Sequence, residues 1–230
     1  MNTIEVLGQP VPEGIDYKGD GFSCYSSAIG YLMFRLGAPE TYWLPSAIDE
    51  LTGRQPDGLT YDTGSGLLAL MDHGAKLTNV HAFDNDRFIN EGLTYLEEYY
   101  AKTWLGADPA NFYQYWQPPR LETQQEFTAK LLGKARGFGE QWSEVKENPT
   151  VESVTASLDV GDKVLLPTKR VQKNILHYPV LLGHEAETGD FISFDAGVVP
   201  PIQPIDIDYF GRAAFNAEWG MVVVGGQELQ

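Results

Sequence analysis

The sequence predicts an α+β protein in which a helical N-terminal part packs on a C-terminal antiparallel sheet. In the first two-thirds of the chain, apolar residues recur at the three- and four-residue spacing of helices. After residue 150 they gather instead in short β-rich runs that end at turns. Helices followed by strands, rather than alternating with them, are typical of the α+β class.

The N-terminal residues predict an irregular segment followed by a regular helix. Residues 1–21 are rich in Gly, Pro and Asp, which favour turns over periodic structure. The run from Cys24 to Leu36 then carries an apolar stripe at helical spacing. Ser23 is an N-cap candidate, and Gly37 follows the last apolar residue as a C′ glycine does. We therefore expect a helix that begins at Cys24.

The central residues predict further helices, one strand and an aromatic patch. Glycines and prolines separate these segments. The expected segments are helices over residues 40–52, 67–73, 86–105 and 122–147, a loop over 53–66, a strand over 76–82 and an aromatic patch over 108–117. Gly137 and Gly139 interrupt the last of these helices.

The last third of the chain predicts one helix and then a sheet that contains a hairpin. Pro149 and Thr150 mark the start of an amphipathic helix that runs to Leu158. The expected strands cover residues 164–166, 178–182, 191–194 and 221–224. Residues 187–190 (ETGD) have the composition of a hairpin turn, so the second and third strands should pair antiparallel.

Length and composition indicate a single domain, residues 1–230, that needs no disulfide to fold. Its three parts are a helical lobe that bears the cysteine (1–85), a helical, aromatic-rich insertion (86–149) and a β-rich lobe (150–230). A single cysteine excludes an internal disulfide and any multi-thiolate zinc or iron–sulfur site. No phosphate-loop or dinucleotide pattern occurs, so we expect neither a metal nor another cofactor.

The charge of the chain limits the classes of partner. Its 16 Lys and Arg stand against 32 Asp and Glu, which gives a formal net charge of -16 and a pI near 4.5. Such acidity argues against nucleic acid and against anionic membrane surfaces, because both attract cationic proteins. The start of the chain lacks the features of a secretory signal, and no stretch is apolar enough to span a membrane. We therefore expect a cytoplasmic protein.

Cys24 is the candidate nucleophile because it lies at the expected start of a helix. The unpaired N–H groups and the positive end of the helix dipole at such a place favour a thiolate over a thiol. A thiolate is the form of cysteine that attacks a carbonyl carbon. The alternative is a buried structural cysteine that acts as a small hydrophobic residue, the common role of a lone cysteine.

His177 and Asp195 are the candidate base and orienting group. We expect His177 to start one strand and Asp195 to end the next, and these positions lie close together in a twisted antiparallel hairpin. An imidazole that is oriented by a carboxylate can take a proton from a thiol, as in a catalytic triad. Alternatively, His177 bonds to backbone at the rim of the sheet, and Asp195 caps the turn at Ala196 and Gly197.

In this order of residues the chain resembles the papain-like cysteine peptidase superfamily, and in particular its double-glycine leader (bacteriocin-processing) peptidase-like branch. Residues 21–28 (GFSCYSSA) are similar to that branch's Asp-Cys-Gly-x-Ala helix start. Residues 151–166 resemble its helix, glycine turn and strand before the histidine. Residues 177–184 (HYPVLLGH) resemble its His-bearing strand, and residues 193–195 (SFD) its Asp-bearing strand.

The resemblance implies a papain-like fold and a thiol protease triad of Cys24, His177 and Asp195. In the family, a Gln shortly before the cysteine donates to the oxyanion, whereas six residues before Cys24 this chain has Lys18. Tyr25 stands where the family has Gly. Loss of a preorganised oxyanion donor lowers the rate about 10²–10³-fold. Either Lys18 or another group therefore substitutes as the oxyanion donor, or the protein is slow or inactive.

Three functions fit this triad. The first is a cysteine hydrolase that cleaves a peptide or small amide through a thioester intermediate. The second is an acyltransferase or peptide-cyclising enzyme, in which an amine resolves the same thioester. The third is a catalytically inactive papain-like scaffold that serves as a binding module.

The charge distribution predicts a preference for cationic peptides. Residues 1–119 hold 6 Lys and Arg against 16 Asp and Glu, and residues 174–230 hold 1 against 8. These two segments contain the whole candidate triad. We therefore expect their negative field to attract cationic peptides and to repel anionic ones.

Overall fold

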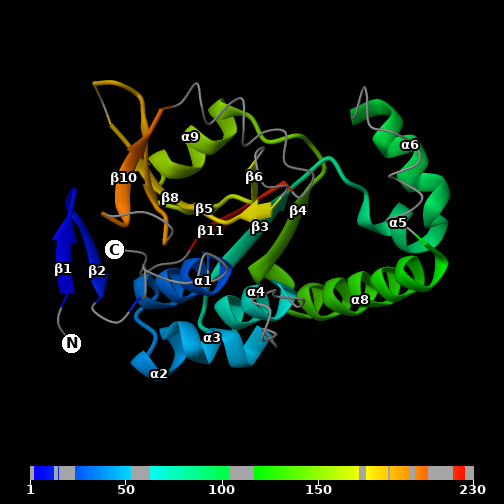
Figure 1. Ribbon diagram of the computed structural model, residues 1–230, viewed down its shortest axis with the longest axis horizontal. Coiled ribbons are helices and arrows are strands. Elements are labelled where there is room, and N and C mark those ends of the chain that lie inside the picture. The colour runs from blue at the N-terminus through cyan, green and yellow to red at the C-terminus, as the bar shows by residue number, and fades with distance from the viewer. Residues whose placement is uncertain are drawn as a thin grey trace.

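The computed structural model describes residues 3–12, 15, 24–52, 63–103, 117–170, 175–185, 187–196, 200–206 and 220–225. It is a mixed α+β structure with N-terminal helices and a mostly antiparallel seven-strand sheet, which confirms the predicted class (Figure 1). The helices are α1 (Cys24–Arg35), α2 (Glu40–Trp43), α3 (Pro45–Thr52), α4 (Thr63–Asp72), α5 (Asn85–Glu91), α6 (Leu93–Thr103), α8 (Pro118–Gly137), α9 (Val151–Asp159) and the 3-10 helix η1 (Gly139–Gln141). The strands are β1 (Thr3–Val6), β2 (Gln9–Pro12), β3 (Lys76–Val80), β4 (Trp142–Val145), β5 (Lys163–Leu165), β6 (Thr168–Arg170), β7 (Ile175–His177), β8 (Val180–His184), β9 (Phe191–Phe194), β10 (Ile202–Ile205) and β11 (Met221–Gly225).

The seven-strand sheet has the strand order β10-β9-β8-β5-β11-β3-β4. Its neighbouring strands pair antiparallel, except for β3 and β4, which are parallel. Two further pairs, β1–β2 and β6–β7, form separate two-strand ribbons. Since β3 and β4 come from the middle of the chain, the sheet extends beyond the C-terminal third to which the apolar runs point.

Apolar side chains on the two faces of the sheet form two separate cores. Figure 1 shows the sheet between the helices α1–α4 on one side and α9 on the other. Successive residues of a strand point to opposite faces, and the central strands β5 and β11 follow this rule. Leu165 and Val222 belong to the core that α1 covers, whereas Val164 and Val223 belong to the core that α9 covers.

Helix α1 is the central helix of the first core, and it confirms the helix predicted from Cys24 onward. Ala28, Ile29 and Leu32 are fully buried, and α1 contacts α2, α3 and α4. Gly37 follows with a φ of 72°, the left-handed conformation that favours glycine after a helix. Because α1 is held by the sheet and by three helices, its first residue has a well-defined position.

The structure divides two of the predicted helices. Residues 40–52 form α2 and α3, and Pro45 begins α3, where a missing N–H removes no intrahelical hydrogen bond. The helix predicted over residues 86–105 is divided, in its described part, into α5 and α6, which are separated at Gly92 with a φ of 55°. The predicted helix at residues 150–158 is confirmed as α9, whose Thr150 side chain accepts from the backbone N of Ser153 in a capping box.

Several segments differ from expectation. Residues 3–12 form the β1–β2 hairpin instead of an irregular lead-in, and Leu7 (φ 50°) and Gly8 (φ 71°) make its two-residue turn. Residues 142–145 form β4 instead of continuing a helix, because the chain turns at Gly139 with a φ of 60°. Strands β6 (TKR), β7 (ILH) and β10 (IQPI) were not expected, because polar residues or proline interrupt the apolar run by which the other strands were predicted.

Some predicted features lie outside the described residues. They are the N-cap candidate Ser23, the oxyanion candidate Lys18, residues 108–116 of the aromatic patch and residues 53–62 of the predicted loop.

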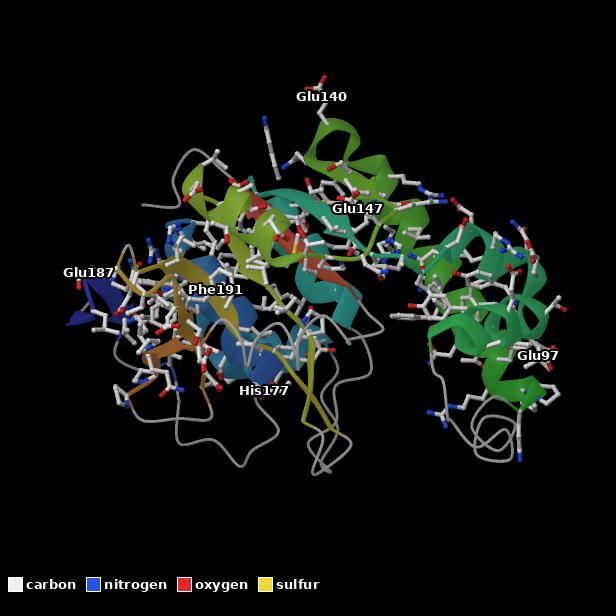
Figure 2. The ribbon with its side chains drawn as sticks, turned by 90° about the horizontal axis from the view of Figure 1, so that it is seen from above. Glu97, Glu140, Glu147, His177, Glu187 and Phe191 are labelled. Carbon is white, nitrogen blue, oxygen red and sulfur yellow. The ribbon has the colours of Figure 1, made fainter. Side chains whose placement is uncertain are left out.

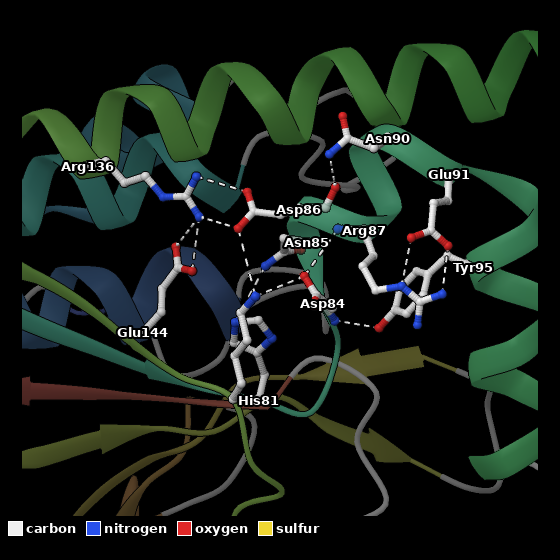
Figure 3. Close-up of polar contacts among 11 residues, drawn as sticks. His81, Asp84, Asn85, Asp86, Arg87, Asn90, Glu91, Tyr95, Arg136 and Glu144 are labelled. Atoms are coloured by element: carbon white, nitrogen blue, oxygen red, sulfur yellow. Dashed lines mark hydrogen bonds and ion pairs between the residues drawn. The ribbon is translucent and has the colours of Figure 1, made fainter.

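Helices α5, α6 and α8 form a helical unit beside the sheet (Figure 1). Phe88, Tyr95 and Leu96 make a small apolar core of their own in this unit. Arg136 of α8 donates two hydrogen bonds of 3.0 Å to the carboxylate of Asp86 (Figure 3). Among the described residues, no helix combines the length and the apolar character that crossing a bilayer requires.

Asp84 connects this helical unit to the segment that follows β4. Its carboxylate caps α5 by accepting from the backbone N of Arg87 at 3.1 Å, and it also accepts from Nζ of Lys146 at 3.0 Å (Figure 3). Burial opposes ionisation of Asp84, but the hydrogen bonds from Lys146 and Arg87 outweigh it and lower the pKa of the carboxyl. The N-terminus of α5 is thereby held at the end of the sheet.

Candidate functional site

Cys24 is the first residue of α1, as the sequence predicts, and its side chain is half-buried. At this position the backbone N–H groups of the first helical turn have no intrahelical partner. The sulfur therefore lies beside a set of donors and at the positive end of the helix dipole. Partial exposure in such surroundings is typical of reactive cysteines, whereas structural cysteines are buried among apolar groups.

His177 is the last residue of β7 and not the first residue of the following strand, which corrects the predicted position. Strand β8 begins only at Val180, because Pro179 has no N–H to donate to a ladder. The β6–β7 ribbon pairs His177 with Thr168. The carbonyl of Pro179 accepts from the backbone N of Leu166 at 3.0 Å, so the segment after His177 is also fixed to β5's end.

Asp195 directly follows β9, as the sequence predicts, and two neighbours fix its position. Its backbone N donates to the carbonyl of Pro201 at 2.7 Å. The preceding residue, Phe194, pairs with Val180 across β8 and β9 and stacks on Tyr31 of α1, with ring centroids 4.2 Å apart and an interplanar angle of 6°. The strand that carries Asp195 is thus packed directly against the helix that carries the cysteine.

The structure brings Cys24, His177 and Asp195 together in one line of side chains. Nε2 of His177 donates to Oδ2 of Asp195 at 2.7 Å, and the ring also shares a side-chain hydrogen bond with Cys24. Because Nε2 faces the carboxylate, Nδ1 is the ring nitrogen left for the thiol. His177 and Asp195 are only 8% and 7% exposed. Figure 2 shows His177 beside α1 and away from the helical unit to which Glu97 belongs.

The surroundings of His177 favour its protonated form. Burial of the ring disfavours the charge, but the hydrogen bonds to Asp195 and Cys24 outweigh burial and raise the pKa of His177 to about 9. At neutral pH an imidazolium therefore lies between a carboxylate and the sulfur. A neighbouring imidazolium is one of the groups that stabilise a cysteine thiolate.

Sequence reasoning singled out the triad residues, but it noted Tyr25 only as a departure from the family's Gly and gave Tyr178 no role. Tyr25 directly follows Cys24, and Tyr178 directly follows His177. Their rings meet edge to face, with centroids 5.0 Å apart and an interplanar angle of 74°. The available signal was the occurrence of an aromatic residue after both the candidate nucleophile and the candidate base.

The described residues of the site include one candidate for an oxyanion donor and contain no metal ligand set. The backbone N–H of Cys24 is a donor at the helix start, whereas Lys18 lies outside the described residues. Across the described ranges, no group of three or more His, Cys, Asp or Glu side chains is arranged to hold a metal ion. The arrangement of a thiol, an imidazole and a carboxylate is suited to acyl transfer.

Comparisons with protein-family models, with curated proteins and with solved structures find no match for this chain. The mixed α+β arrangement and the contacts among the three side chains are therefore the features from which its chemistry is inferred.

Proposed function

We propose that the chain is a cysteine peptidase-like hydrolase with a papain-like arrangement of its helices and sheet, and that it cleaves a peptide or small amide bond. The observation that carries this proposal is the continuous contact from Cys24 through His177 to Asp195. A helix start, a buried imidazole and a buried carboxylate from three separate elements meet at this one place. A nucleophile, its base and an orienting group in this order form the template of nucleophilic acyl transfer.

In the first half of the reaction, the Cys24 sulfur attacks the carbonyl carbon of the substrate. His177 holds the proton that leaves the thiol, and Asp195 keeps the imidazolium oriented. As the C–S bond forms, negative charge moves to the carbonyl oxygen, toward which the backbone N–H of Cys24 can donate. The C–N bond then breaks, His177 gives its proton to the leaving amine, and a thioester remains on Cys24.

In the second half of the reaction, water resolves the thioester. His177, now neutral, takes a proton from the water molecule whose oxygen attacks the thioester carbon. The C–S bond breaks, the carboxylic acid product leaves, and the proton returns to the Cys24–His177 pair. Asp195 again orients the ring through Nε2, so the same imidazole serves as base and as acid in both halves.

The experiment that tests this proposal is alkylation of Cys24 by iodoacetamide at pH 6, with the adduct located by mass spectrometry. Wild type should react at least tenfold faster than the urea-unfolded chain, because a free thiol is mostly protonated at this pH. His177→Ala should slow the reaction by about 10²-fold, the lower end of what positioned acid–base groups contribute. His184→Ala is the matched control, because His184 contacts Asp159 instead of the triad, and it should leave the rate unchanged.

A wild-type rate equal to that of the unfolded chain would refute the proposed function. Turnover is tested in parallel with a library of unblocked peptides, from which new N-termini are detected by mass spectrometry. Cys24→Ser should abolish that cleavage, because a serine hydroxyl is a far weaker nucleophile when its partner base is tuned for a thiol. Cleavage that persists in Cys24→Ser at the wild-type rate would exclude Cys24 as the nucleophile.

A further inference from the structure

Tyr25, which follows Cys24, and Tyr178, which follows His177, form a direct ring contact between the segments that carry these two candidate catalytic residues. Tyr25 lies in the first turn of α1, and Tyr178 lies between β7 and β8. Their ring centroids are 5.0 Å apart at an interplanar angle of 74°. Edge-to-face aromatic pairs of this geometry are attractive beyond simple burial.

Tyr25 is also close to α4. Its side chain is only 3% exposed. A Cβ atom at Gly66 would lie 2.5 Å from the Tyr25 hydroxyl and 3.1 Å from Cγ1 of Ile29, so α4 approaches this ring more closely than any side chain would allow. The Tyr25 ring is therefore close to α4 at Gly66 and in contact with Tyr178, and both neighbours limit its position.

Tyr178 belongs to a segment in which backbone pairing is interrupted. It follows the last residue of β7 and precedes Pro179, which cannot donate to a strand ladder. Its half-buried ring packs against the core that α1 covers. Burial and the charge of Cys24 both raise the pKa of Tyr178, so the phenol stays neutral beside the site. Backbone contacts to Thr168 and Leu166 hold the residues on either side of Tyr178, and the ring contact with Tyr25 is an additional contact at Tyr178 itself.

We propose that Tyr25 and Tyr178 are positioning residues, whose ring contact holds the Cys24 sulfur and the His177 imidazole at hydrogen-bonding distance. This inference rests on the proposed function. The two catalytic groups come from different elements, α1 and the β6–β7 ribbon, and the tyrosines join those elements one residue away from each group. A displacement of about 1 Å between reacting groups is enough to cost up to 10²-fold in rate.

Asp195, the third member of the triad, is held by a different contact, so the proposed role of the tyrosines concerns only Cys24 and His177. Asp195 follows Phe194, whose ring stacks on Tyr31 two turns further along α1. Loss of the Tyr25–Tyr178 contact should therefore separate the thiol from the imidazole while Asp195 remains packed on α1. The expected defect is in the contact between the thiol and the imidazole and not in the fold.

The test is the rate of Cys24 alkylation by iodoacetamide between pH 5 and pH 10. In Tyr178→Leu the alkylation rate at pH 6 should fall at least tenfold, because the imidazole would no longer be held at hydrogen-bonding distance from the sulfur. Tyr178→Phe retains the ring and should keep the wild-type profile. Gly66→Ala pushes on Tyr25 from the side of α4 and should reproduce the Tyr178→Leu profile even where the leucine variant folds poorly.

Phe34→Leu is the matched control. Phe34 of α1 forms an edge-to-face pair with Trp43, with ring centroids 5.8 Å apart at 71°, but this pair lies at the opposite end of α1 from Cys24. Phe34→Leu should lower the melting temperature and leave the alkylation profile unchanged. If Tyr178 contributed only to the stability of the fold, Tyr178→Leu would likewise lower the melting temperature and leave the alkylation profile unchanged.

The outcomes separate this proposal from the proposed function. A fast, His177-dependent wild type with an unaltered profile in Tyr178→Leu or in folded Gly66→Ala would overturn the positioning role alone. A Tyr178→Phe variant as slow as Tyr178→Leu would also overturn it, because the hydroxyl and not the ring contact would then be responsible. A wild-type thiol no faster than that of the unfolded chain would refute the proposed function and this inference with it.

Discussion

Nε2 of His177 lies 2.7 Å from Oδ2 of Asp195, and only a tenth of either side chain is exposed. A buried carboxylate and a buried imidazole at this distance stabilise one another's charged forms, since each alone would be costly to bury. The pair faces the sulfur of Cys24 through the ring's other nitrogen. Its charge state therefore links the stability of the fold to the chemistry of the thiol.

The stability of the protein should fall as the pH rises through 9. The pKa of His177 is raised to about 9 in the folded chain and is near 6.5 in the unfolded chain, so its contribution is fully present below about pH 6.5 and is lost above about pH 9. A difference of two to three units between the folded and unfolded pKa values of His177 corresponds to roughly 3 kcal/mol in the free energy of unfolding. Urea unfolding of wild type and His177→Gln from pH 6 to pH 10 measures this contribution. A difference in their free energies of unfolding that stays constant over this range would contradict the prediction.

Asp195→Asn should move the deprotonation of His177 to lower pH. A neutral amide supports the imidazolium less than a carboxylate does, so the shift should be about 1 to 3 pH units. The measurement is the ratio of alkylation rates by anionic iodoacetate and neutral iodoacetamide, because an imidazolium attracts only the anion. In wild type this ratio should drop near pH 9. An identical profile in Asp195→Asn would show that the carboxylate does not support the ring's charge.

Cationic peptides should be better substrates than anionic ones if the proposed hydrolase activity holds. The formal charge of -16 creates a negative field that raises the local concentration of cations and is screened by salt. At low ionic strength a Lys-rich peptide should be cleaved several-fold faster than a Glu-rich peptide of equal length, and the ratio should approach one in about 0.5 M salt. Rates that are equal for both peptides at every salt concentration would count against a role for the field.

Phe194→Ala should destabilise the fold by about 3–5 kcal/mol, the usual cost of deleting a fully buried aromatic ring. Phe194 is completely buried and stacks on Tyr31, so its removal leaves a cavity between β9 and α1. Val160→Ala is the control, because Val160 is 76% exposed and its change should cost less than about 0.5 kcal/mol. Equal unfolding midpoints for the two variants would mean that β9 is not held by this contact.

Asp84→Ala should destabilise α5 more than Asp84→Asn does. Both changes remove the ion pair with Lys146, which is partly exposed and contributes little. Only the alanine variant also loses the acceptor that caps α5, at a cost of about 1 kcal/mol. Hydrogen exchange of the α5 amides measures the difference, and equal exchange in the two variants would assign the effect to the ion pair instead of the cap.

The sequence determined the features that depend on neighbouring residues. An apolar stripe closed by Gly37 is enough to define α1 and to place Cys24 at its start. A turn at residues 187–190 between two apolar runs is enough to define the β8–β9 hairpin and to place Asp195 at its end. These signals are short-range, because helix periodicity, capping and turn geometry are read from a few successive residues.

Only the tertiary structure decided how those elements meet. It placed His177 at the end of β7, because Pro179 delays the next strand, and it brought the imidazole to Cys24 across a large separation in sequence. It also paired Tyr25 with Tyr178. Contacts of this kind depend on side-chain packing between distant segments, which no local pattern encodes. The sequence thus identified the chemical groups of the candidate site, whereas only packing set the distances between them.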